Sequence, residues 1–127
     1  HPIFLDAAKA RIAVDTIYAV QQRFPFFLHA FVIMPDHCHF LLRVPKPGYV
    51  SRIMQAYKKG VSFEIAEGPI WQSRFDCRIV KDHGDVIQYI HSNPINAGFC
   101  SKPEEYPWSS ASGKWDVIEL DFVGGFM

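Results

Sequence analysis

The sequence has few cysteines, no surplus of charge of either sign and no long apolar run. Its three cysteines are far apart and form no CxxC pair, which excludes a disulfide framework and favours a reducing cytoplasm. Thirteen lysines and arginines balance thirteen acidic residues, which argues against a protein that binds polyanions over its whole surface. No stretch approaches the roughly 18 apolar residues of a membrane span, so we expect no membrane partner.

The residues that are present favour one packed domain over residues 1–127. Apolar residues make up 49% of the chain and charged residues 20%, which is typical of a globular core rather than of disorder. The charge is unevenly distributed, because the segment 43–81 carries eight basic and three acidic residues and the segment 104–121 carries five acids and one lysine. This permits a localised anion-binding face, although scattered solvated charge explains the same counts.

The order of the apolar patterns predicts alternating helices and strands. Asp6 is a candidate N-cap, Pro25 a stop signal, and the Pro35-Asp36 pair a hairpin turn. Gly60 marks a weak point in the second helix, and Pro94 predicts the end or a kink of the third. We therefore expect an α+β fold, with an antiparallel sheet, helices on one face and an interior second strand. The expected helices span residues 6–24, 50–66 and 82–93, the expected strands residues 26–34, 37–44 and 70–80, and the remainder is mostly loop.

Two histidines flank a cysteine where the second expected strand begins, in "HCHFLL". Side chains alternate along a strand, so His37 and His39 point the same way, about 6.6 Å apart, while Cys38 points the other way. Two imidazoles at that spacing suit one divalent metal ion. A pair of hydrogen-bonded histidines on an edge strand explains the same pattern.

The third expected helix offers further candidates. Val86, Tyr89, Ile90 and Asn93 share one face at helical spacing, so the two apolar residues would turn Tyr89 and Asn93 toward the sheet. A core tyrosine and an asparagine at a helix end are the plainer interpretations. Considered together with His37 and His39, Tyr89 and Asn93 favour a catalytic interpretation instead. An ion held by two imidazoles and an amide oxygen polarises a phosphate, which a tyrosine can attack.

Four segments carry a resemblance to a known family. "MPDHCHFLL", "IWQSRF", "QYIHSNPINAGF" and "EEYPWSSA", in this order and spacing, resemble the single-tyrosine HUH transposases, and most of all the REP-associated tyrosine transposases. The resemblance covers residues 1–111. It implies a ferredoxin-like α+β fold. It also implies an endonuclease and strand transferase that cleaves and rejoins single-stranded DNA beside hairpins through a 5′-phosphotyrosine intermediate.

The resemblance also implies residue roles. His37, His39 and Asn93 match the positions that hold Mg²⁺ or Mn²⁺, and Tyr89 matches the nucleophile. No nucleotide cofactor is implied, and the protein would act as a monomer or a homodimer. Family sequences carry a further strand before the segment that matches residues 1–4, so we expect the single HUH-like catalytic domain at 1–127 to lack that strand.

The basic middle of the chain supplies candidate DNA contacts. Cations there would bind phosphates and an aromatic residue would stack on an unpaired base, unless the aromatic residue is core and the cations are merely solvated. The candidates are Arg52, Lys58, Lys59, Trp71, Arg74 and Arg78.

Two other functions fit parts of the sequence. The first is a domesticated DNA-binding protein of the same fold without catalysis. The second is a zinc-stabilised interaction domain that uses His37, His39 and a cysteine. The second is disfavoured because Cys38 faces away from both histidines and structural zinc requires four ligands.

Overall fold

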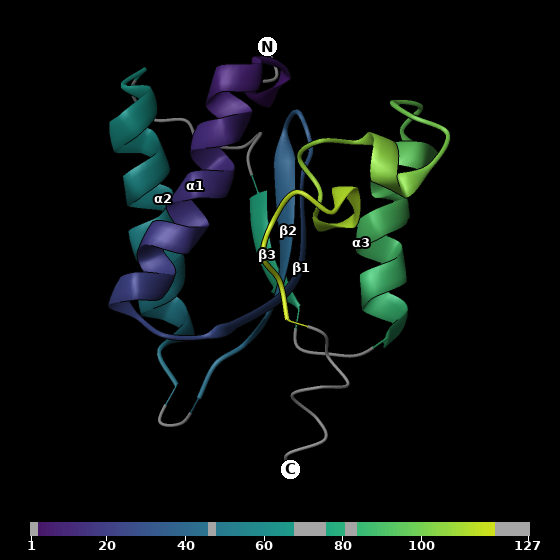
Figure 1. The fold of residues 1–127 in the computed structure, drawn as a ribbon. Coiled ribbons are helices and arrows are strands. Elements are labelled where there is room, and N and C mark those ends of the chain that lie inside the picture. Colours follow the sequence, from purple (N-terminus) through teal and green to yellow (C-terminus); the bar gives the residue numbers. More distant parts are fainter. Residues whose placement is uncertain (1–2, 46–47, 68–75, 81–83, 119–127) are drawn as a thin grey trace. The chain divides into compact units, whose positions relative to one another are not determined.

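The computed structural model describes residues 3–45, 48–67, 76–80 and 84–118. Three strands form one sheet in the order β1-β2-β3, and helices accompany them, so the expected α+β class is confirmed (Figure 1). β2 lies between the other two strands, which confirms its predicted interior position. The elements are α1 (Ala7–Arg23), β1 (Phe27–Ile33), β2 (His37–Arg43), α2 (Val50–Ile65), β3 (Asp76–Val80) and α3 (Gly84–Asn96), with short 3-10 turns η1 (Ile3–Leu5), η2 (Pro103–Glu105) and η3 (Ser110–Ser112).

The chain divides into two compact units that share the strands of the sheet. The first contains α1 and α2, and the second contains α3 and the segment that follows it. The expectations of a single domain and of helices on one face stay predictions. The first unit comprises His1–Phe26, Ile33–Cys38 and Val44–Cys77, and the second comprises Phe27–Val32, His39–Arg43 and Arg78–Met127.

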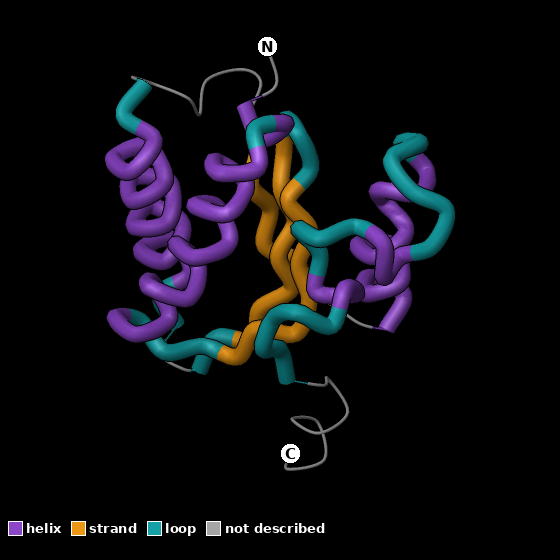
Figure 2. Tube along the Cα trace, turned by 45° about the horizontal axis from the view of Figure 1, so that its top comes forward, coloured by secondary structure: helices purple, strands orange, loops and turns teal. Residues whose placement is uncertain are grey.

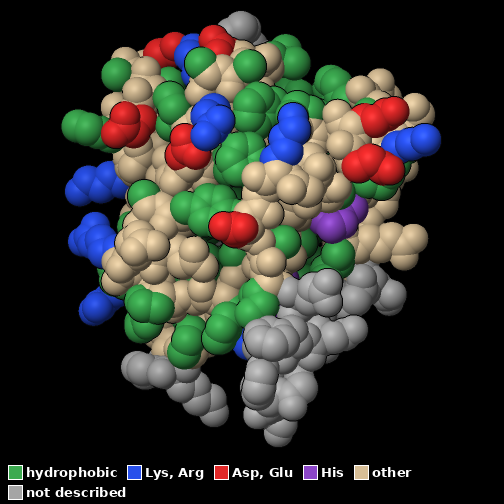
Figure 3. Space-filling model, in the orientation of Figure 1, with side chains coloured by type: hydrophobic (Ala, Val, Ile, Leu, Met, Phe, Trp, Pro, Cys, Tyr) green, Lys and Arg blue, Asp and Glu red, His purple; other side chains and the backbone are tan. Residues whose placement is uncertain are grey.

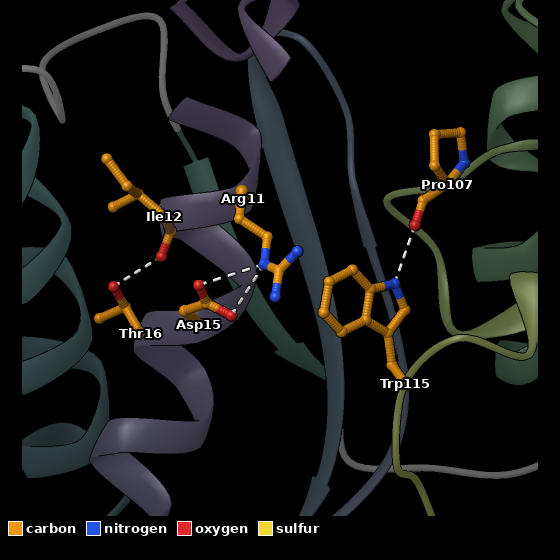
Figure 4. Close-up of polar contacts among 6 residues, drawn as sticks. All are labelled: Arg11, Ile12, Asp15, Thr16, Pro107 and Trp115. Carbon is orange, nitrogen blue, oxygen red and sulfur yellow. Dashed lines mark hydrogen bonds and ion pairs between the residues drawn. The ribbon is translucent and has the colours of Figure 1, made fainter. Parts of the chain in front are cut away.

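α1 forms where its local signals predict a helix. The Asp6 carboxylate caps it by accepting the backbone N–H groups of Ala8 and Lys9 at 2.8 and 3.3 Å. Apolar residues at helical spacing form its buried face, namely Ala10, Ala13, Val14, Ile17 and Val20. On the exposed side Arg11 pairs with Asp15 one turn later, at 3.2 Å (Figure 4). The helix ends at Arg23, because proline at position 25 does not continue it.

β1 and β2 form the expected hairpin around Pro35 and Asp36. The backbone N–H of Met34 donates to the carbonyl of His37 at 2.7 Å, which closes the turn and makes His37 the first residue of β2. The five residues between His37 and Arg43 are all buried, as a central strand requires. The turn therefore sets the register in which the two histidines enter the sheet.

α1 and α2 lie side by side in the first unit, and Gly60 is the point of close approach (Figure 2). A Cβ at Gly60 would lie 2.9 Å from Cγ2 of Thr16. The Thr16 hydroxyl donates to the carbonyl of Ile12 at 2.7 Å, which holds that methyl group in place (Figure 4). The expected weak point in α2 is thus a helix–helix contact, and the helix runs through it without a break.

A double-mutant cycle tests this contact. In a Thr16→Ser background, which keeps the hydroxyl and removes the methyl, Gly60→Ala should stabilise the protein by about 1 kcal/mol through helix propensity. In the unmodified background the clash should cancel or reverse that gain, since overpacking costs about 1–3 kcal/mol. Urea unfolding measures all four proteins. An equal effect of Gly60→Ala in both backgrounds would show that the methyl group does not limit the approach.

α3 extends beyond the expected end at Pro94. Pro94 lies inside the helix, in its last turn, and the helix runs to Asn96. Gly98 adopts φ +84° and donates its N–H to the carbonyl of Ile95 at 2.9 Å, while Phe99 donates to Pro94, also at 2.9 Å. These two bonds form a Schellman motif, so glycine rather than proline ends the helix. Asp82, where the expected helix begins, lies outside the described residues.

The segment after α3 is mostly loop, as expected, but it is bonded along β1. Ser109 forms an antiparallel bridge with Val32, and the backbone N–H of Ile118 donates to the carbonyl of Leu28 at 2.9 Å. The indole of Trp115 donates to the carbonyl of Pro107 at 2.8 Å and so ties the loop to itself (Figure 4). Residues 109–118 therefore satisfy backbone groups of the edge strand β1.

Candidate functional site

His39 and Tyr89 meet in the second unit. His39 comes from β2 and is 8% exposed, and Tyr89 comes from α3 and is 57% exposed. Their ring centroids are 5.8 Å apart with an interplanar angle of 70°, an edge-on contact. A shielded imidazole thus supports the ring of a phenol that is open to solvent. Sequence reasoning predicted both residues for the site, and the structure brings them together.

The exposure of Tyr89 differs from the inward position that the helical pattern suggested. Ile90 is fully buried and Val86 is half-buried, so Ile90 occupies the centre of the packed face. Tyr89 is one step around the helix from Ile90, at the margin of that face. A phenol at the margin can meet a large substrate such as a nucleic acid, whereas a core tyrosine cannot.

The other four tyrosines are less accessible, and all of them lie in the described part of the chain. Tyr57, which precedes two lysines, is fully buried and donates its hydroxyl to the carbonyl of Ala13 at 2.8 Å. Burial, with a smaller effect of Cys100, raises the pKa of Tyr106 to about 12. Tyr18 and Tyr49 are half-buried. Accessibility therefore singles out Tyr89.

His37 opens β2 beside an acidic neighbour. Its Nδ1 lies 2.7 Å from Oδ1 of Asp36. A carboxylate on one ring nitrogen can orient an imidazole whose other nitrogen binds a metal, so Asp36 is a candidate supporting residue that sequence reasoning missed. The signal was an acid directly before a candidate ligand. Because His37 belongs to the first unit and His39 to the second, its place beside α3 stays a prediction.

The donor set fits a divalent ion only with an oxygen ligand added. Among the described residues there is no group of three or more His, Cys, Asp or Glu side chains that could hold a metal. The half-buried Asn93, one turn after Tyr89, would have to supply an amide oxygen, with water completing the shell. Two imidazoles with oxygen ligands suit Mn²⁺ better than Mg²⁺. The zinc–cysteine alternative finds no such cluster in the same residues.

The candidate DNA contacts on α2 form an exposed stripe. Arg52 and Lys59 are exposed and lie two turns apart on one face, while Lys58 is half-buried beside them. Figure 3 shows Lys and Arg side chains gathered at the left edge of the view, over α2. Phe63 continues the stripe one turn later and is 78% exposed. Sequence reasoning missed Phe63, although its helical spacing from Lys59 was visible.

The other candidate DNA contacts are not tested. Trp71 and Arg74 lie outside the described residues. Arg78 belongs to β3, whose backbone alone is described. Their contribution stays a prediction.

The face of α3 away from Tyr89 carries a second polar contact. Nε2 of His91 lies 2.8 Å from Oγ of Ser110, and Ser110 Oγ accepts the backbone N–H of Phe31 at 3.0 Å. Burial lowers the pKa of His91. Both residues lie inside the quoted family segments, but no spacing rule connects them, so sequence reasoning gave them no role.

Comparisons with known proteins give a family and several similar proteins. A family model described as "Transposase IS200 like" matches residues 2–93. A putative REP-associated tyrosine transposase of Haemophilus influenzae is 30% identical over 107 residues, which cover 70% of this chain and 61% of the relative. A REP-associated tyrosine transposase of Escherichia coli is 29% identical over 99 residues, covering 74% and 59%. The chain thus spans about three fifths of the length of these curated relatives.

A solved structure supports the fold. A REP-associated tyrosine transposase bound to a REP hairpin aligns with a TM-score of 0.68 and 22% identity, covering 94% of this chain and 81% of the other. In the described part of this chain, the helices are too short or too polar to cross a membrane.

Proposed function

We propose a function for this chain on the premise that it belongs to the IS200-like transposase family, whose model matches residues 2–93. The chain cleaves and rejoins single-stranded DNA beside a hairpin, and Tyr89 carries the DNA as a 5′-phosphotyrosine. The observation that supports this most is the contact of the exposed Tyr89 ring with His39 at 5.8 Å between centroids. A REP hairpin is the ligand that the structurally similar transposase binds.

The proposed reaction is an exchange of phosphodiester bonds. The Tyr89 oxygen attacks a backbone phosphorus and loses its proton, the bond from phosphorus to the 3′-oxygen breaks, and the 3′-oxygen leaves and takes a proton. Because the phosphotyrosine keeps a phosphodiester, a 3′-hydroxyl can later attack it and release Tyr89. No nucleotide is consumed in either step.

The other candidate residues have separate proposed roles. His39 holds the phenol ring edge-on, and His37, oriented by Asp36, joins His39 and Asn93 as ligands of Mg²⁺ or Mn²⁺. When bound, that ion supplies charge stabilisation at the phosphate. The stripe Arg52, Lys59 and Phe63 is proposed to track the unpaired strand, with cations on phosphates and the exposed ring under a base. Whether the protein acts as a monomer or a homodimer stays a prediction.

A covalent-capture experiment tests the proposal. The protein is incubated with a labelled single strand that carries a hairpin, with Mn²⁺ or with a chelator, and separated under denaturing conditions. We expect a shifted protein–DNA band that requires the metal and the hairpin. Tight binding without an adduct would instead support the alternative of a non-catalytic DNA-binding protein of this family.

A further inference from the structure

We propose that His91 and Ser110 are positioning residues that hold the tyrosine-bearing helix α3 against β1. The inference rests on the proposed function, because these two residues would determine the orientation of the Tyr89 side chain. It assigns a role to residues 109–112, which lie beyond the part of the chain that the family model matches.

Ser110 joins three segments that are distant in sequence. Its hydroxyl oxygen accepts the backbone N–H of Phe31 at 3.0 Å, lies 3.3 Å from the Phe31 carbonyl oxygen, and lies 2.8 Å from Nε2 of His91. The residue is 7% exposed. One buried hydroxyl therefore links β1, α3 and η3, and the residues that it joins, Phe31, His91 and Ser110, belong to the same compact unit.

The junction that Ser110 forms between β1, α3 and η3 is held by further bonds. Ser109 caps η3 by accepting the backbone N–H of Ala111 at 3.1 Å, and its own backbone bridges to Val32 on β1. Ser110 is thus held on both sides by bonds to the strand and the turn. A hydroxyl fixed in this way can fix the imidazole that contacts it.

Helix geometry places this contact opposite the reacting group. Tyr89 and His91 are two residues apart, which is about 200° around an α-helix. Tyr89 contacts His39 of β2 on one side, and His91 contacts Ser110 on the other. α3 is therefore held at two points across its axis, and loss of the His91 contact frees it to rotate. Rates of attack are sensitive to such movement, since a misplacement of about 1 Å costs on the order of a hundredfold.

The end of α3 is anchored independently, which makes the role separable from folding. Phe99, at the Schellman motif, packs against Tyr106 with ring centroids 6.2 Å apart. In a His91 variant, α3 should therefore stay docked through its end and the buried Ile90. Its orientation, and with it the position of Tyr89, should be less restricted.

The test compares three variants of α3. His91→Leu keeps the bulk of the side chain and removes the hydrogen bond. His91→Gln places a terminal amide where Nε2 lies and keeps the bond. Ser92→Ala is the matched control, because among the described contacts its hydroxyl donates only within the helix, to the Gln88 carbonyl.

Two readouts separate position from stability. The first is the single-turnover rate of adduct formation with its DNA dissociation constant. We expect His91→Leu to lower the rate by about 10- to 100-fold at an unchanged dissociation constant, and His91→Gln and Ser92→Ala to stay within about threefold. The second is the ¹⁹F resonance of 3-fluorotyrosine at position 89, whose shift reports the nearby His39 ring. It should move in His91→Leu and not in the other two.

The outcomes decide the inference even if the proposed chemistry fails. An unmoved resonance and rate in His91→Leu overturns it, as does an equal loss of rate in His91→Gln with the resonance unmoved. If the unmodified protein forms no adduct, the proposed function fails, and the resonance alone decides whether the junction positions Tyr89. If His91→Leu does not fold, Ser110→Ala removes the same bond, and a moved or unmoved resonance in that variant supports or overturns the inference.

Discussion

Tyr89→Phe is expected to abolish the covalent DNA adduct and strand cleavage together, below the limit of detection. The variant lacks the oxygen that would bond to phosphorus, so no residual rate through the same intermediate remains. The ring itself stays, and with it the edge-on contact to His39 at 5.8 Å between centroids. Denaturing gels with hairpin DNA and Mn²⁺ measure both losses.

The fold and the DNA affinity should survive this change. Tyr89 is 57% exposed, and substitutions at such surface positions usually alter stability by about 0.5 kcal/mol or less. Thermal melting and binding titrations serve as controls. Tyr18→Phe is the matched variant, because Tyr18 is half-buried on α1 and should keep full activity. A persistent phosphotyrosine in Tyr89→Phe would refute the assignment and the site built on it.

Removal of the candidate metal ligands is expected to cause the second largest loss. His37→Ala and His39→Ala should each lower the rate of adduct formation by about a thousandfold at moderate Mn²⁺, because metal stabilisation of several kcal/mol corresponds to that factor. His39→Ala also removes the ring that supports Tyr89, so it should not recover fully when Mn²⁺ is raised. His37→Ala should recover in part, since it loses only a ligand.

A graded variant sharpens this prediction. In the unmodified protein, Nδ1 of His37 lies 2.7 Å from the Asp36 carboxylate. Asp36→Asn keeps an acceptor oxygen at this position and removes the charge. Supporting residues of this kind contribute about 10- to 100-fold to metal affinity, so the Mn²⁺ concentration for half-maximal rate should rise by a factor in that range. If the histidine variants and the unmodified protein form the adduct equally fast in the presence of a chelator, the metal has no part in the mechanism.

Residues that act locally were predicted well. Asp6 caps α1 and the Pro35-Asp36 pair turns the hairpin, as their neighbours in sequence indicate. The end of α3 is also determined locally. The expected end at residue 93 was wrong, because the helix runs to Asn96, and the alternative of a kink at Pro94 stays a prediction. Proline in the last turn gives up one hydrogen bond, whereas Gly98 supplies the positive φ that a Schellman motif needs. The residue that ends the helix thus lies four positions after the proline.

The candidate site shows what the spacing of residues along a helix can predict and what it cannot. Helical spacing correctly placed Tyr89 and Asn93 on one side of α3, but it did not determine how that side is rotated against the sheet. Packing of Ile90 decided this and left Tyr89 exposed at the margin. Likewise the spacing of Arg52, Lys59 and Phe63 was visible, whereas the 78% exposure of the phenylalanine is a property of the folded chain.

The sequence by itself determined the order of elements, the α+β class, the interior place of β2 and the family, because periodicity, caps, turns and ordered motifs are all carried by neighbouring residues. Only the tertiary structure decided which distant groups meet. Gly60, expected to be a weak point, lies at a helix–helix contact with Thr16. Ser110 accepts a hydrogen bond from Phe31, which lies 79 positions away in the chain. No local pattern encodes such pairs, since each depends on how whole elements pack, and burial of the core selects that packing.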